Sequence, residues 1–343
     1  MHKATFLEGQ IELSLQPNGP ILIKAGESGG ADPTLPDMEF VRSVNDQVFI
    51  PGSSLKGVIR AQAERICRSL DSEAQQQRRQ QARRELAADE PRIPLADNPL
   101  GRSKEYRGLS DMEYSSGGYI ESLRESLQKH PERTAVIYRR SSFVSQIFGH
   151  TSLAGRVRFA DAYGKDVILE ERNGVAIDRI YGSVAVGPFN YETAVKGTFP
   201  TRITFKNLTL AQLGLLGLAL RDLADGRIGI GFGKSRGLGR VSVSFDSLEI
   251  YYPTCECKSD SLALLSGRTV APLTHIVGLG ALCDQATYRE YHLPQADSAP
   301  LPPDLAYVND EFLGVRLQAV GDEQVKAIWR ACMPAWKQEL GLL

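Results

Sequence analysis

Glycine and basic residues are interleaved in residues 226–241, whose sequence is GRIGIGFGKSRGLGRV. Glycine permits positive φ angles and lets other groups approach the backbone closely. Lys234 and Arg236 stand among these glycines and could hold phosphate groups, with backbone N–H groups assisting. The string contains no GxxxxGK[ST] P-loop, and it follows an expected helix rather than a strand, unlike a dinucleotide fingerprint. A phosphate-binding loop and a glycine-rich packing loop both remain open.

A second candidate for phosphate binding is IPGSSLKG, residues 50–57. The turn leads into an expected helix, whose first N–H groups and dipole favour an anion. Ser53, Ser54 and Lys56 add hydroxyl donors and a positive charge. The alternative is an ordinary capped helix in which Ser53 or Ser54 is the N-cap.

Two further segments contain residues suited to chemistry or stacking. Asp37 lies in the loop PDMEFVRS (36–43) and could act as a base, orient a nucleophile or help hold a metal. An isolated loop aspartate is more often a turn residue. Residues 177–199 can form a protruding hairpin that offers Tyr181 and Phe189 for stacking on bases.

Composition limits the class of protein. A chain of 343 residues can hold a large core or two to three domain-sized pieces. The net charge of −1 means that any nucleic-acid binding relies on local patches. The sequence shows neither a signal-peptide core at its start nor an apolar run of membrane length. We therefore expect a cytoplasmic protein without a membrane partner.

The elements that must position these residues alternate between strand and helix. Apolar and polar residues alternate at Ile11, Leu13 and Leu15, which predicts a strand. A short strand, a turn and a helix are expected within 47–70, and further helices at 141–150 and 209–226, the last capped by Thr209. Strands are expected at 155–164, within 173–208 and at 239–252. A closing helix interrupted at Pro334 is also expected. This order favours an α+β, ferredoxin-like core over a parallel sheet.

Composition also changes along the chain. We expect a core over residues 1–250, interrupted by an insertion at about 71–140 whose polar stretch contains arginine pairs at 78–79 and 83–84. A C-terminal extension covers residues 251–343 and contains a proline-rich connector.

Four strings, in the order in which they occur along the chain, resemble the RAMP superfamily, and specifically the backbone subunits of type III CRISPR effector complexes. FIPGSSLKGVIR (49–60) is similar to the family's most recognisable string, and GIGFGKSRGLGRV (229–241) to its glycine-rich loop. AIDRIYGSVAVGPFNYETAVKGTFP (176–200) resembles the thumb of the target-cleaving subunit, and FADA (159–162) also matches. The resemblance covers about residues 5–250 except the 71–140 stretch, which indicates a divergent member.

The resemblance implies an RNA-recognition-type ferredoxin core with a thumb at about 173–199. Such a subunit would stack along a CRISPR RNA beside other effector subunits and hold complementary target RNA, with base pairing supplying the sequence specificity. The implied stacking residues of the thumb are Tyr181 and Phe189. The implied RNA-binding residues are Arg42, Ser53, Ser54, Lys56, Arg60, Arg179, Gly233, Lys234, Arg236 and Gly237.

In the family, an aspartate in the loop before the PGSSLKG string supports cleavage of target RNA. Asp37 lies five residues before Arg42, as the pattern requires, and Asp32 is the fallback; the usual proline after the aspartate is absent. The resemblance implies attack by the RNA 2′-hydroxyl, assisted by Mg²⁺ or Mn²⁺, which leaves a 2′,3′-cyclic phosphate and a 5′-hydroxyl. A non-catalytic backbone subunit with the same RNA-binding residues is the alternative.

Histidine and cysteine residues offer two weaker hypotheses. His150 could be a general base if the chain instead processed guide RNA. Five scattered cysteines give no disulfide framework, and the C-x-C spacing of Cys255 and Cys257 disfavours a zinc site. The remaining zinc candidates, His275, Cys283 and His292, are irregularly spaced, so we expect ordinary buried cysteines.

Overall fold

The computed structural model describes residues 3–25, 38–76, 93–98 and 114–341. The strands are β1 (Glu8–Pro17), β2 (Phe49–Ile50), β3 (Val157–Phe159), β4 (Ala162–Tyr163), β5 (Lys165–Ile177), β6 (Val184–Lys206), β7 (Val241–Tyr252), β8 (Cys255–Lys258), β9 (Ser261–Leu264), β10 (Thr269–Pro272), β11 (His275–Val277), β12 (Ser298–Pro300), β13 (Tyr307–Asn309) and β14 (Val315–Val320). The helices are α1 (Gly52–Leu70), α3 (Ser116–Ser122), α4 (Arg124–Gln128), α5 (Arg133–Arg139), α6 (Phe143–Phe148), α7 (Leu210–Ala224), α8 (Leu279–Leu282), α9 (Gln285–Tyr291) and α10 (Asp322–Glu339), with a 3₁₀ turn η2 (Lys234–Arg236).

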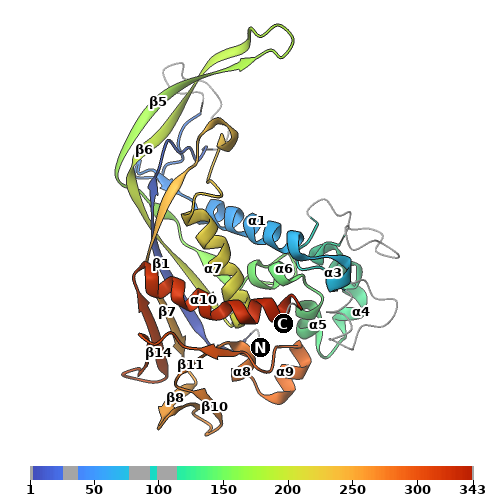
Figure 1. The fold of residues 1–343 in the computed structure, drawn as a ribbon. Coiled ribbons are helices and arrows are strands. Elements are labelled where there is room, and N and C mark those ends of the chain that lie inside the picture. Colours follow the sequence, from blue (N-terminus) through green and yellow to red (C-terminus); the bar gives the residue numbers. More distant parts are fainter. Residues whose placement is uncertain (1–2, 26–37, 77–92, 99–113, 342–343) are drawn as a thin grey trace.

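A curled antiparallel sheet runs through the centre of the protein (Figure 1). Its strand order is β13–β14–β7–β1–β6–β3, and β5 also pairs with β6. The predicted alternation in β1 is confirmed, because Ile11, Leu13 and Leu15 are buried while Glu12 is exposed. One face of β1 therefore belongs to the core and the other does not.

Helices α1, α7 and α10 pack together on the core face of this sheet (Figure 1). The predicted cap of α7 is confirmed: the Thr209 hydroxyl accepts the N–H of Gln212, and the Gln212 side chain accepts the N–H of Thr209. The helix is buried on nearly all sides because it lies between the sheet, α1 and α10. Gly217 permits this packing, since a Cβ there would lie 2.3 Å from Cγ of Trp329.

The long hairpin of β5 and β6 leaves the body of the protein (Figure 1). Strand β6 has 23 residues and serves two purposes. Residues 199–206 pair with β1 inside the sheet, whereas residues 184–198 pair with β5 and extend outward. The predicted hairpin feeding a strand is confirmed, whereas the strand expected at 155–164 is two short strands, β3 and β4.

The described part of the 71–140 stretch contributes α3, α4 and α5. These helices form a second apolar cluster together with α8 and α9, in which Tyr138 packs against Tyr291. The Arg139 guanidinium also donates to the carbonyl of Glu290. Residues 77–92 and 99–113, which include the arginine pairs, lie outside the described residues.

The chain beyond residue 250 contributes to the same sheet. Strand β14 pairs with β7 and with β13, and α10 packs on α7. The predicted interruption of the closing helix is wrong, because α10 runs through Pro334. Burial of Trp329, Cys332 and Trp336 on one side of α10 stabilises the helix against the hydrogen bond that proline removes.

Within the described ranges, no helix combines the length and the apolar character needed to cross a membrane.

Candidate nucleic-acid interface

The glycine-rich segment is a tight loop built onto the sheet. Gly231 (φ +71°) lies against the carbonyl of Leu22, which a Cβ at residue 231 would approach to 2.1 Å, and the next N–H donates to that carbonyl. Gly233 and Gly237 have φ angles of +69° and +82° and bracket the η2 turn. Glycine is therefore required here for backbone shape, and the result is a tight turn that carries Lys234 and Arg236.

This loop and α1 together enclose a cavity of about 350 Å³. Helix α1 supplies three lining residues at helical spacing: Val58, Ala61 and Arg65. The loop and its approach supply Gly226, Arg227, Ile228, Gly229, Lys234, Gly237, Leu238 and Arg240. We call this cavity the α1–glycine-loop pocket. It brings the glycine-rich loop together with the middle of α1; the residues of the IPGSSLKG string (50–57) do not line it.

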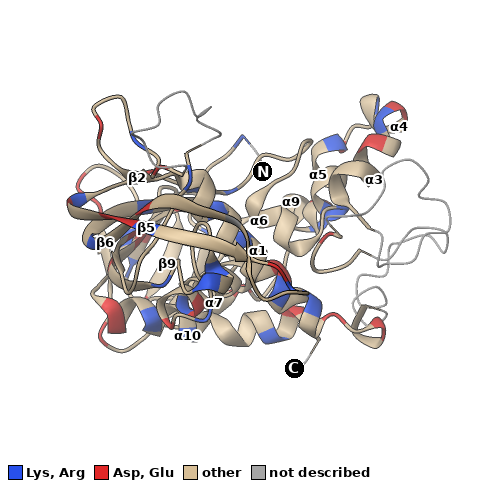
Figure 2. Ribbon diagram, turned by 90° about the horizontal axis from the view of Figure 1, so that it is seen from above, with Lys and Arg blue, Asp and Glu red and all other residues tan. Residues whose placement is uncertain are grey.

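The pocket is lined by four cations and by no carboxylate. Arg227 is paired with Asp222 and Asp225, but in the described residues Lys234, Arg65 and Arg240 have no carboxylate partner. Partial desolvation and the nearby Arg65 lower the pKa of Lys234. Converging cations without a counter-charge raise the local positive potential, which favours an anionic ligand. Figure 2 shows basic and acidic residues interspersed over the ribbon.

Arg65 was missed by the sequence interpretation. Its signal was spacing: Val58, Ala61 and Arg65 recur at helical intervals and therefore share one face of α1. Arg236 was predicted together with Lys234, but it is exposed and does not line the pocket.

The start of α1 differs from the prediction. Neither Ser53 nor Ser54 caps the helix; Pro51 is at the N-cap position, without a side-chain cap. The carboxylate of Asp161, from the FADA string, instead accepts the N–H of Gly52 at 2.7 Å. A carboxylate at this place already uses the positive end of the helix, so the phosphate site is better placed at the pocket than at the helix start.

The other basic residues predicted to bind RNA differ in whether their side chains are already held by ion pairs or hydrogen bonds. Arg42 is held by Glu192 at 2.6 Å and by Asp46 at 3.2 Å. Arg60 donates to the carbonyl of Gly149 and is paired with Glu64, so it joins α1 to the end of α6. Lys56 is half-buried, has no ion-pair partner in the described chain, and its pKa is lowered by burial and by Arg60.

The tip of the β5–β6 hairpin is shaped by Asp178. Its carboxylate accepts the N–H groups of Ile180 and Tyr181 at 2.7 and 2.9 Å, and these bonds lower the pKa of Asp178. Tyr181 is 83% exposed at this tip, next to the exposed Arg179. Phe189 lies lower on the hairpin, half-buried against Tyr191. The two predicted stacking residues are therefore not equivalent.

Asp37 and Asp32 lie outside the described residues. The residue that follows Asp37 is placed: Met38 donates its N–H to the carbonyl of Asn190, and its own carbonyl accepts the N–H of Glu192. Met38, the first described residue after Asp37, therefore lies beside strand β6, in the part of β6 that pairs with β5.

The histidine and zinc hypotheses gain no support. His150 Nε2 lies 2.8 Å from the hydroxyl of Ser141, which donates to the carbonyl of Ile137, and Nδ1 accepts the N–H of Ser152. Both ring nitrogens are thus engaged. Across the described segments, no three His, Cys, Asp or Glu residues gather as a metal site. Burial raises the pKa of Cys255 to about 11 and of Cys283 to about 12, which opposes the thiolate form that zinc binds.

Comparison with known proteins gives one result. A family model described as the RAMP superfamily matches residues 15–242, which is more than half of the chain. The matched range contains α1, the β5–β6 hairpin and the glycine-rich loop. No curated protein matches the chain.

Proposed function

The chain belongs to the RAMP superfamily, and from this premise we propose that it is a guide-RNA-binding backbone subunit of a type III CRISPR ribonucleoprotein. Membership of the superfamily indicates a CRISPR-associated RNA-binding protein. The observation that carries the proposal is the α1–glycine-loop pocket, where Lys234, Arg65 and Arg240 converge without a carboxylate on the wall.

The proposal includes a ferredoxin-like core. Its support is the strand order β7–β1–β6–β3, with α1 following β1 and α7 following β6 in the chain and both helices on one face. The β5–β6 hairpin would then be the thumb, with the exposed Tyr181 at its tip reaching toward the guide–target duplex.

In this function the pocket binds the sugar–phosphate backbone of the guide. Cations at fixed positions attract phosphates regardless of the base, and the loop N–H groups can add hydrogen bonds. Base pairing with the guide would then select the target, so the protein need not read sequence.

We extend the proposal to cleavage of the target RNA. Asp37, or Asp32 in its place, would orient the reacting nucleotide so that its 2′-oxygen attacks the adjacent phosphorus and the 5′-oxygen leaves. A divalent cation, Mg²⁺ or Mn²⁺, would offset the charge that develops on the phosphate. Support comes from the resemblance of the Asp37 loop to the loop that supports cleavage in the family, and from the position of Met38 beside β6. A non-catalytic subunit would have the same pocket and differ only at this loop.

The test of RNA binding is fluorescence anisotropy with labelled guide RNA over a range of salt concentrations. The variant Lys234→Ala/Arg65→Ala removes two cations that have no carboxylate partner among the described residues, whereas Arg330→Ala removes an exposed arginine on α10 outside the pocket. Each lost phosphate contact should reduce the slope of log affinity against log salt by about 0.7. We expect a slope about 1.4 smaller for the double variant and no change for Arg330→Ala. Equal slopes for the unmodified protein and both variants would contradict the proposed binding of phosphates by Lys234 and Arg65.

A further inference from the structure

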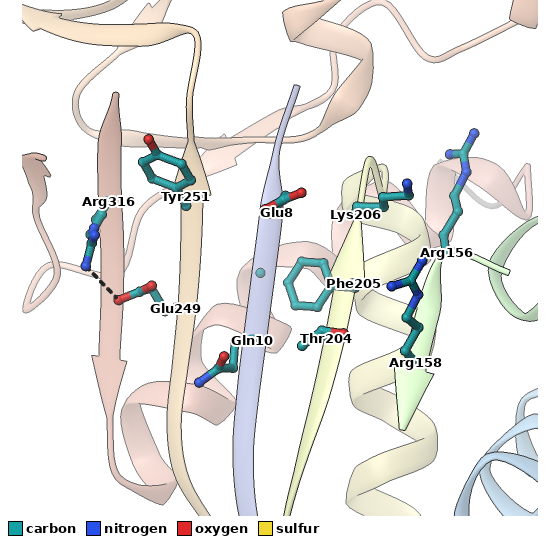
Figure 3. A pocket seen from close by; sticks show the side chains of 11 residues that line it. Glu8, Gln10, Arg156, Arg158, Thr204, Phe205, Lys206, Glu249, Tyr251 and Arg316 are labelled. Atoms are coloured by element: carbon teal, nitrogen blue, oxygen red, sulfur yellow. Dashed lines mark ion pairs between the residues drawn. The ribbon is translucent and has the colours of Figure 1, made fainter. Parts of the chain in front are cut away.

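The face of the sheet opposite α7 and α10 carries a second cavity, of about 410 Å³ (Figure 3). Strand pairing places its side chains in two rows across the sheet. One row is Arg316–Tyr251–Glu8–Lys206, and the next is Glu249–Gln10–Thr204–Arg158. All eight residues line the cavity, together with Gly9, Phe205 and Arg156. We call this surface the open-face site; none of its residues belongs to the α1–glycine-loop pocket.

Positive charge is concentrated at one end of the open-face site. Arg158 on β3 and Lys206 on β6 have no ion-pair partner within the described chain. Because Arg158 pairs with Thr204, Lys206 is its diagonal neighbour, about 7–8 Å away along the sheet. The buried Arg156 is not available in the same way, because its guanidinium donates to the carbonyl of Asn207 at 2.6 Å and lies over the ring of Tyr138. Arg158 and Lys206 could contact one phosphate or two successive ones.

The other end of the open-face site presents a fixed aromatic ring. The Tyr251 hydroxyl donates to the carbonyl of Leu313 at 2.6 Å, so the ring cannot rotate freely. Arg316, with its guanidinium carbon 5.8 Å from the ring centre, is paired with Asp310 at 2.6 Å. The ring is half-buried and is seen nearly face-on from the open side in Figure 3. A rigid aromatic surface of this kind can stack on a base.

Between the two ends lie groups that can bind the edge of a base. Glu8 separates Tyr251 from Lys206, and Gln10 and Thr204 stand in the adjoining row. A carboxylate accepts hydrogen bonds from the amino groups of bases and repels phosphate, so it favours one orientation of a nucleotide. Tyr251 and Lys206 are two strand spacings apart, about 10 Å, which an extended nucleotide can span.

We infer that the open-face site binds single-stranded RNA, with a base stacked on Tyr251 and phosphate held by Arg158 and Lys206. This inference rests on the proposed RNA-binding function and adds a second RNA contact on the opposite side of the sheet. A protein partner fits less well, because the core of a protein interface is depleted of charged residues and this surface is rich in them.

The experiment uses the full chain and a short single-stranded RNA that carries fluorescein and 4-thiouridine. In the Lys234→Ala/Arg65→Ala background, adding Tyr251→Leu should weaken the remaining affinity about tenfold, a typical loss for one stacked base. Adding Tyr251→Phe, which retains the ring, should weaken it much less. Photo-crosslinks should map to the β7 peptide that contains Tyr251 and persist in that background.

Two outcomes would overturn the inference. If Lys234→Ala/Arg65→Ala weakens binding, but Tyr251→Leu and Arg158→Ala/Lys206→Ala do not and no crosslink reaches β7, the proposed function stands without the open-face site. If none of these variants changes the affinity, RNA binds through neither surface, and both the proposed pocket function and the open-face site fall. Thermal melts of each variant show whether a loss of affinity reflects a loss of folding.

Discussion

The carboxylate of Asp161 lies at the first turn of α1, where it accepts the backbone N–H of Gly52 at 2.7 Å. The backbone that precedes Asp161 also packs on this glycine, because a Cβ at Gly52 would lie 2.2 Å from the carbonyl oxygen of Phe159. Two strings separated by 109 residues thus form one joint. That joint fixes where α1 begins and therefore where Arg65 faces the glycine-rich loop.

Replacing Asp161 with alanine should lower the free energy of unfolding by about 1 kcal/mol, since the variant loses a side-chain cap. Asp161→Asn retains an oxygen acceptor and should lose much less. Urea denaturation of the two variants and the unmodified protein measures the difference. Equal losses for Ala and Asn would mean that the charge, and not the hydrogen bond, stabilises the helix start.

Asp37→Ala should abolish one or more cuts in guide-complementary RNA while the complex still assembles. The reason is that the proposed reaction depends on one carboxylate and a divalent cation. Cleavage of labelled target by the reconstituted complex is measured with Mg²⁺ or Mn²⁺, and again with EDTA, which should stop it.

The matched variant for this test is Asp32→Ala. If only this variant loses the cuts, the register of the loop is shifted and Asp32 carries the role. If the double variant still cuts at the same sites, the subunit only holds RNA.

Tyr181→Leu should weaken the binding of target RNA to the guide-loaded complex about tenfold, because the exposed ring at the hairpin tip can stack on a base. Guide binding should not change, since Tyr181 does not line the α1–glycine-loop pocket. Filter binding with separately labelled guide and target distinguishes the two. Tyr181→Phe keeps the aromatic face and should behave like the unmodified protein; a loss in Phe equal to that in Leu would rule out stacking.

The buried Asp297 should make stability depend on pH. Its carboxylate accepts N–H groups from Leu210 at the start of α7 and from Gly280, both at 2.9 Å. Burial outweighs these bonds and raises the pKa of Asp297 to about 7. The folded state therefore binds a proton more tightly than the unfolded chain, in which the pKa is about 4.

It follows that the free energy of unfolding should fall as pH rises from about 4 to about 7, by at most about 1.4 kcal/mol per pH unit, and then level off. Asp297→Asn cannot titrate and should lack this contribution. The measurement is the difference in urea-unfolding free energy between the two proteins at several pH values. A difference that does not vary with pH would contradict the raised pKa.

Local sequence patterns were sufficient to predict the elements whose structure is determined by residues that are neighbours in the chain. The alternation in β1, the Thr209 cap and the helical spacing in α7 all involve neighbours in the chain, so the sequence predicts them directly. The glycine-rich loop was also correctly placed between α7 and β7. The positive φ angles at Gly233 and Gly237 are ones that glycine adopts readily, so the glycines themselves indicated a tight turn.

The predictions that were wrong or incomplete concern contacts between residues that are distant in sequence. Asp161 replaces the expected serine cap of α1, and the glutamate that holds Arg42 lies 150 residues away, on β6. Pro334 was expected to break a helix, yet packing of Trp329 and Trp336 outweighs its local effect. No spacing rule reveals such contacts, because they depend on how the chain folds back on itself.

The pairing of β14 with β7 has a consequence for any shortened form of this protein. The family match ends at residue 242, before β8–β14 and α10. A chain cut near residue 250 would leave β7 as a bare sheet edge and uncover the side of α7 on which Trp329 rests. Exposed edges pair readily with other chains, so we expect such a fragment to aggregate rather than bind RNA as a monomer. We therefore expect the range that matches the family to need the C-terminal residues in order to stay monomeric.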